Sequence, residues 1–165
     1  MVNEILGSDC VDTKTPHQSK GDVSSFYLEI PVHLRKTIKI KKFDADCIKK
    51  LLKIEHKIAD SFFYIIQGGK SQLKEKWLIV ENKGDKFSDA IEQLNKSLEM
   101  FADSKASIHG RIITKQVPNI LPSSEKSKYD KLQESFSKKK GSVRRGNKVL
   151  IEKIISFSES EFTND

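Results

Sequence analysis

Long apolar runs are missing from this sequence. No stretch approaches the roughly 20 apolar residues that cross a bilayer, which excludes a helical integral membrane protein. The opening residues, MVNEILGSDCVDTK, have neither a basic start nor an apolar core, so we expect no secretory signal. Cysteine is also scarce. The two cysteines, Cys10 and Cys47, are too few for a disulfide framework or a four-cysteine zinc site. We expect a reducing, intracellular location, either the nucleus or the cytoplasm.

Familiar catalytic patterns are absent as well. The four histidines, His17, His33, His56 and His109, show no metal-ligand spacing to one another or to a cysteine. The sequence QGGK at 67–70 lacks the first glycine of a phosphate loop and is better explained as a hairpin turn. Cys47 is explained as a small core residue, and Asp44 and Asp46 as helix-capping groups. We therefore predict a protein that is not an enzyme and uses no cofactor and no metal.

Positive charge is abundant and unevenly placed. The net charge is +7, and residues 104–157 contain 13 lysines and arginines against four acidic residues. Clustered basic side chains that neutralise phosphates release counterions, which favours binding to a polyanion. The alternative is that lysine serves only to keep the chain soluble. The charge pattern predicts contact with nucleic acid.

Composition divides the chain into four parts. Residues 1–24 are polar and aperiodic and are expected to form a flexible N-terminal tail. Residues 25–103 are expected to form an α+β domain, 104–157 a basic C-terminal extension, and 158–165 an acidic tail. Within the extension, residues 138–148 are expected to be a disordered basic arm.

Periodicity predicts the elements of the central domain. Phe26, Leu28 and Ile30 alternate with polar residues, which is typical of a strand with one buried face. A stripe of apolar residues from Phe87 to Phe101 predicts a helix over 86–102, capped by Asp85. A helix over 44–62, strands at 62–67 and 76–81, and a short helix over 124–138 complete the prediction.

Three segments of the domain are similar to a known family. These are LEIPVHLRKTI, IKKF at 40–43, and LIVENKGDKFSDAIEQL. Residues 26–102 resemble a degenerate type I KH domain, which implies the order strand, helix, helix, strand, strand, helix and a groove for a single nucleic-acid strand. Ile40 and Phe43 stand where the family has its two loop glycines. A different α+β sandwich, ferredoxin-like or other, follows if 37–41 is a strand rather than part of a helix and loop.

The candidate binding residues are two groups of basic side chains. Their partner would be RNA, so we expect a non-enzymatic RNA-binding protein or a subunit of a ribonucleoprotein. The alternative is a protein–protein interaction module or assembly factor that keeps a KH-like fold without binding nucleic acid. Neither reading involves a membrane. The first group contains Arg35, Lys36, Lys39, Lys41, Lys42, Lys49, Lys50 and Lys53; the second contains Lys138, Lys139, Lys140, Arg144, Arg145 and Lys148.

Overall fold

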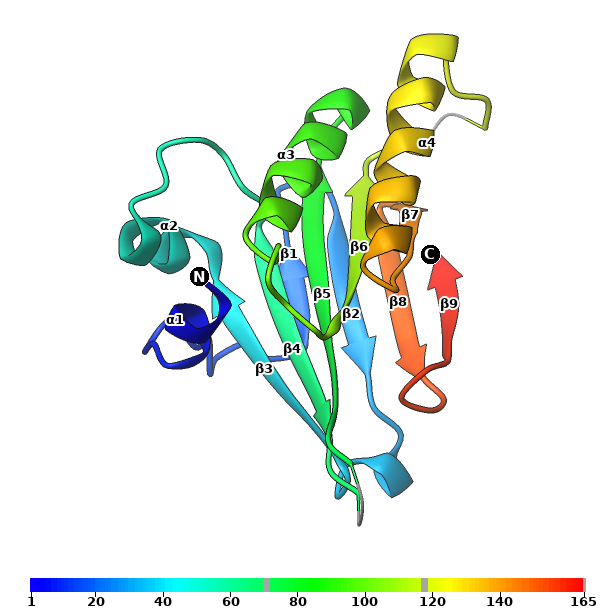
Figure 1. Cartoon of the computed structure of the whole chain (residues 1–165). Coiled ribbons are helices and arrows are strands. Elements are labelled where there is room, and N and C mark those ends of the chain that lie inside the picture. Colours follow the sequence, from blue (N-terminus) through cyan, green and yellow to red (C-terminus); the bar gives the residue numbers. More distant parts are fainter. Residues whose placement is uncertain (70–71, 117–118, 165) are drawn as a thin grey trace.

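Three layers make up the fold in the computed structural model, which describes residues 1–69, 72–116 and 119–164. Helices α3 (Phe87–Glu99) and α4 (Ser123–Lys138) cover one face of a five-stranded sheet, and a four-stranded sheet covers the other (Figure 1). The expected α+β class is confirmed. The other elements are α1 (Val2–Leu6), β1 (Gln18–Lys20), β2 (Ser25–Glu29), the 3-10 helix η1 (Val32–Leu34), β3 (Ile38–Asp44), α2 (Ala45–Leu52), β4 (Ser61–Gln67), β5 (Lys74–Lys83), β6 (Ser107–Thr114), β7 (Val143–Asn147), β8 (Val149–Ile154) and β9 (Ser160–Asn164).

The five-stranded sheet has the order β3-β4-β5-β6-β7. Strands β3, β4 and β5 form an antiparallel meander, whereas β5, β6 and β7 are parallel. Parallel neighbours need a long crossover, and here α3 and α4 supply the two crossovers. The carboxyl ends of β5, β6 and β7 therefore meet at one edge of the sheet, beside the amino end of β4 (Figure 1).

The second sheet joins the two ends of the chain. Its order is β1-β2-β8-β9, and β2 runs parallel to β8, from Ser25 opposite Val149 to Glu29 opposite Lys153. The acidic tail predicted for 158–165 is instead partly strand, since β9 pairs antiparallel with β8. The N-terminal and C-terminal segments thus together form the second sheet, which packs on the five-stranded sheet.

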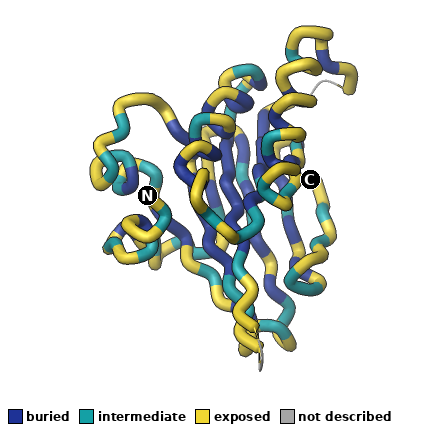
Figure 2. Tube along the Cα trace, viewed as in Figure 1, coloured by how far each residue is buried: buried dark blue, intermediate teal, exposed yellow. Residues whose placement is uncertain are grey.

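Side-chain alternation along β5 separates two cores. Trp77 and Ile79 pack under the helices, whereas Leu78 and Val80 pack against the second sheet. Successive strand residues point to opposite faces, so a strand buried on both sides is apolar throughout. The continuous buried colour along the central strands in Figure 2 follows from this arrangement.

The predicted helices are confirmed in part. Asp44 caps α2 as expected, because its carboxylate accepts a hydrogen bond from the Cys47 amide at 2.8 Å. However, α2 ends at Leu52 rather than at 62, and Lys53 takes a left-handed conformation with φ of 53°. The stripe on α3 is buried as predicted, but Lys86 and not Asp85 is the N-cap residue.

The strand at β3 decides between the two readings of 33–43. Only three residues form η1, and residues 38–44 pair along their length with β4. The helix and loop that the KH-like order requires are therefore not there, and the alternative with a strand in this region is correct. The alternation of Ile38 and Ile40, both packed against the second sheet, is the physical reason.

The flexible N-terminal tail predicted for 1–24 is also wrong. Ile5 and Cys10 are buried, and the amide of Asp12 donates to the carbonyl of Lys42 at 2.8 Å. Residues 10–12 thereby lie along the edge of β3, and a disulfide joins Cys10 to Cys47. Cys47 is thus not simply a small core residue. We refer to residues 8–17 as the N-terminal strap.

The basic extension predicted for 104–157 belongs to the same fold, since it supplies β6, α4, β7 and β8. The hairpin turn expected at 67–70 falls partly outside the described residues. Across the described part of the chain, no helix combines the length and the apolar character needed to span a bilayer.

Candidate functional site

A buried carboxylate near the end of β5 is the starting point of the site. Glu81 is 0% exposed and lies in phase with Trp77 and Ile79, on the helix side of the sheet. Beyond Lys83 and the Asp60 backbone, its oxygens have no hydrogen-bond partner among the described residues. Lys83 forms an ion pair with it, with Nζ 3.0 Å from Oε1. A fully buried carboxylate with so few partners is costly, which makes Glu81 a candidate functional group.

A second carboxylate, Asp60, stands beside Glu81. It directly precedes β4, and its Oδ2 accepts a hydrogen bond of 2.7 Å from the backbone amide of Asn82. This bond fixes Asp60 next to the end of β5. Asp60 is exposed, so the pair has one acid inside the protein and one open to solvent.

The two acids raise the energy of each other's ionised form. Burial and, to a smaller extent, the charge of Asp60 raise the pKa of Glu81 to about 8, although Lys83 and the Asp60 backbone act in the opposite sense. Desolvation also raises the pKa of Asp60, against the lowering effects of the Asn82 amide and of Lys83. Two close carboxylates with a single lysine form a site that a bound cation would stabilise.

Two further buried polar atoms lack partners in the described chain, and one of them lies at the same strand ends. Buried Oγ1 of Thr114 lacks a hydrogen bond in the described chain, and Thr114 is the register partner of Lys83. Oε1 of Gln93 on α3 also lacks one. Gln93 lies one turn before Ser97, whose hydroxyl accepts the amide of Ala59, the neighbour of Asp60. Such a concentration of unpaired polar atoms is typical of a ligand site.

Lysines continue the site across the sheet edge. The amide of Lys115 donates to the carbonyl of Gly84 at 2.9 Å, and the amide of Lys148 donates to the carbonyl of Thr114 at 2.7 Å. Lys83, Lys115 and Lys148 therefore follow one another at the carboxyl ends of three adjacent strands. In sheets with parallel strands and crossover helices, this edge is where ligands bind.

The donor set is small for a metal held by protein alone. The described residues contain no group of three or more histidine, cysteine or acidic side chains placed to share an ion. Mg²⁺ is nevertheless commonly held by one or two carboxylates together with water and substrate phosphates. Asp60 and Glu81 match that requirement, whereas they would not form a site for zinc.

The first predicted group of basic residues does not form one surface. Arg35 and Lys36 follow η1, while Lys39 and Lys41 are exposed on β3. Lys42 points the other way, is buried, and pairs with Asp12 at 2.8 Å. The remaining members lie on or just after α2: Lys49, Lys50 and Lys53.

The second predicted group is part of the fold rather than a disordered arm. Lys138 ends α4 and pairs with Glu134, Lys139 bonds to the carbonyl of Ala102, and Lys140 lies in the following turn. Arg144 and Arg145 belong to β7; the guanidinium of Arg144 lies 3.9 Å from the centre of the Phe162 ring, and that of Arg145 lies near Tyr129. Of this group, only Lys148 reaches the strand-end site.

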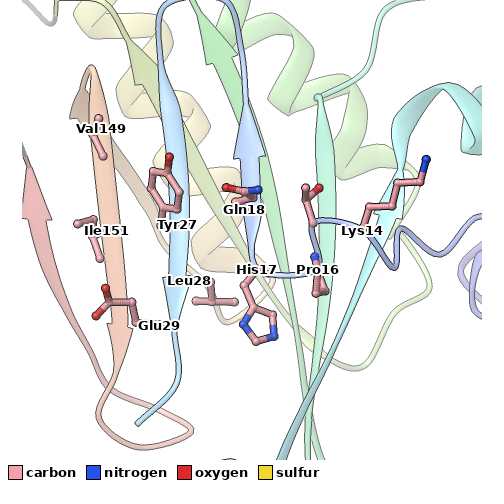
Figure 3. Close-up of a pocket in the computed structure, with 10 residues that line it drawn as sticks. Lys14, Pro16, His17, Gln18, Tyr27, Leu28, Glu29, Val149 and Ile151 are labelled. Carbon is pink, nitrogen blue, oxygen red and sulfur yellow. The ribbon is translucent and has the colours of Figure 1, made fainter.

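A further hollow lies elsewhere. It measures about 610 Å³ and opens on the outer face of the second sheet, over β2 between β8 and the segment that leads into β1 (Figure 3). Tyr27, Val149 and Ile151 give it an apolar floor, with Lys14 and His17 at its margin. Burial and the charge of Arg35 lower the pKa of His17. None of Asp60, Glu81 and Lys83 lines it, so it is separate from the carboxylate pair.

Sequence reasoning missed Asp60, Glu81 and Lys83, although one signal was present. Trp77, Ile79 and Glu81 are spaced by two in the strand predicted at 76–81, so the carboxylate shares a face with two large apolar side chains. The partner Asp60 has no such signal, because only the pairing of β4 with β5 brings it to Glu81.

Comparison with known proteins adds no identification. The chain matches no family model, no curated protein and no solved structure.

Proposed function

We propose that this protein is a divalent-cation-dependent nuclease that hydrolyses phosphodiester bonds at the strand-end site. The observation that carries the proposal is Glu81, a fully buried acid whose carboxylate lies next to Asp60 and 3.0 Å from the Lys83 ammonium. The enzymatic reading departs from the non-enzymatic role expected from the sequence, which stays a prediction.

Each side chain has a distinct part in the hydrolysis. Asp60 and Glu81 would hold the cation, which when bound polarises the phosphate and lowers the pKa of water. Lys83 is placed to donate to a non-bridging phosphate oxygen or to the attacking water. Water adds to phosphorus, the bond to the leaving ester oxygen breaks, and a proton passes to that oxygen. One phosphodiester and one water thus give a phosphomonoester and an alcohol.

The charge of the chain supports a polyanionic substrate. The net charge is +7, and the exposed residues Lys115 and Lys148 follow the carboxyl ends of β6 and β7, beside the end of β5. Basic side chains at these positions favour a nucleic-acid backbone over a small neutral ester. The prediction of contact with RNA or DNA is therefore kept, now located at the edge rather than on β3 and α2.

The test is cleavage of labelled RNA and DNA oligonucleotides by the full chain, with Mg²⁺ or Mn²⁺ and with EDTA. We expect cleavage only with the cation, and at least a roughly hundredfold loss in Asp60→Asn, Glu81→Gln and Lys83→Met. Glu55→Gln, which changes an exposed acid in the loop before β4, is the matched control and should cleave like the wild type. Cleavage that survives in Asp60→Asn and Glu81→Gln would refute this site.

The second candidate is a non-enzymatic nucleic-acid-binding protein, which the exposed lysines on β3 and α2 favour. The same experiment separates the two functions. Salt-sensitive binding without cleavage under any cation would support the second candidate, whereas absence of both would favour a protein-interaction module.

A further inference from the structure

A polar hollow of about 400 Å³ adjoins Asp60, the exposed member of the carboxylate pair. Asp60 and Asn82 form one side of it, and the tip of the β1–β2 hairpin forms another. The hairpin tip, which we define as residues 20–22, contributes Lys20, Gly21 and Asp22. Side chains at the end of β3, among them Asp44, close the remaining side.

The hairpin lies unusually close to the end of β5. A Cβ atom on Gly21 would stand 2.8 Å from Cβ of Asn82, which is closer than side chains tolerate. The glycine amide also donates to the carbonyl of Ser24 at 2.8 Å, which closes the turn. Glycine at this position therefore lets the hairpin tip stand directly against the site.

A network of hydrogen bonds fixes that approach. Ser19 on β1 accepts from the Asn82 amide group at 2.6 Å and from the Ser61 hydroxyl at 2.8 Å. Ser24 donates across to the carbonyl of Ile113 at 3.2 Å. The second sheet is thus attached to the strand ends of the first by its hairpin.

One buried polar atom in the wall of the hollow has no partner. Asn82 is 8% exposed, and its Oδ1 accepts no hydrogen bond from the described residues. Asp22 and Asp60 add carboxylate oxygens to the same lining. The lining is therefore rich in acceptors, which match the amino and imino donors on the edges of nucleobases and repel phosphates.

Lys20 provides the opposite charge at the hairpin tip. It is exposed and has no ion pair within the described residues, whereas Lys42, which also lines the hollow, is neutralised by Asp12. Lys20 is therefore the cation available to a phosphate outside the acceptor-rich interior.

We propose that this hollow is a subsite for one unpaired nucleotide next to the cleaved bond, with its base inside and its phosphate on Lys20. The proposal rests on the nuclease function given above. A base within a duplex has its donor groups occupied by pairing, so the subsite selects single-stranded substrate or an end with splayed bases.

The experiment compares single-stranded and fully paired oligonucleotides of the same sequence. We expect the wild type to cleave the single strand at least about tenfold faster. Lys20→Ala should raise KM for the single strand about three- to tenfold with kcat nearly unchanged, and should lower the salt dependence of binding by about one counterion. Asp22→Asn should change the base found next to the cut.

The controls are Lys105→Ala and Asp103→Asn, which alter exposed residues before β6, at the opposite end of that strand. The subsite is refuted if Lys20→Ala and Asp22→Asn behave like these controls, or if the paired substrate is cleaved as fast as the single strand. Binding titrations in EDTA keep the two proposals separate. Absence of cleavage would refute the nuclease function, whereas equal affinity of Lys20→Ala and wild type for a single strand would refute the subsite by itself.

Discussion

Replacing Glu81 with glutamine should stabilise the fold even as it removes activity. The folded state holds the Glu81 carboxyl with a pKa of about 8, against an ordinary value of 4.5, because burial and Asp60 disfavour the ionised form. The unfolded chain releases this proton at lower pH. The contribution of Glu81 to the free energy of unfolding is therefore fully present below pH 4.5. It is lost as the pH rises toward 8.

The size of the effect follows from this difference. At pH 7 the buried acid lowers the free energy of unfolding of the wild type by roughly 3 kcal/mol relative to a chain without it. Glutamine still buries an amide with few partners, so we expect a net gain of about 1–3 kcal/mol. For a chain of this length, that gain corresponds to a rise in melting temperature of about 2–12 °C.

The assay is urea denaturation of wild type and Glu81→Gln at pH 5 and pH 7.5 in EDTA. The variant should be the more stable at pH 7.5. The difference in free energy of unfolding between variant and wild type should be about 2–3 kcal/mol smaller at pH 5. Glu55→Gln should follow the wild type at both values. An advantage that does not change with pH, or a less stable variant at pH 7.5, would refute the assignment of Glu81 as a desolvated acid.

Three further predictions test other parts of the fold. Burial, together with Arg111 and Lys76, lowers the pKa of His109 to about 4, so stability should fall as the pH drops from 6.5 toward 4; His109→Gln should flatten this slope in denaturation curves, and an unchanged slope would contradict it. Cys10→Ser should lower the free energy of unfolding by roughly 2–4 kcal/mol, because the disulfide spans 37 residues; equal stability of wild type with and without reductant would show that the strap does not need it. Gly141→Ala should unfold the protein or strongly lower its melting temperature, because the new Cβ would stand 1.6 Å from the Ile108 carbonyl oxygen, whereas nothing lies within 4 Å of the Cβ in the control Gly68→Ala; a stable Gly141→Ala protein would return 138–148 to the flexible arm expected from the sequence.

Local pattern predicted the elements but not their arrangement. The stripe from Phe87 to Phe101 and the hairpin of β4 and β5 could be read from spacing, because each depends on neighbours in sequence. Helix α1 and the N-terminal strap could not, because their buried apolar residues are only Ile5 and Cys10, which pack on a surface formed by distant residues. Glycines and basic residues in 138–148 indicated disorder, yet the parallel pairing of β7 with β6 orders them.

The candidate site shows the same limit more strongly. Its residues come from the start of β4 and the end of β5, and the proposed subsite adds a hairpin from the other sheet. Lys148 was included among the binding residues for its charge alone, and the fold places it at the site. Charge counts predict a class of partner, whereas the positions of the candidate residues depend on sheet topology.

The parallel pair of β2 and β8 has a consequence for how the chain is made. Residues 25–29 pair with 149–153, so nearly the whole polypeptide must leave the ribosome before β2 finds its neighbour. Until then Phe26 and Leu28, both buried in the finished fold, have no β8 beside them. Contacts so distant in sequence slow folding and prolong the exposure of apolar strands. Synthesis of this chain should therefore depend on chaperones, and premature termination before β8 should yield aggregates rather than a smaller folded protein.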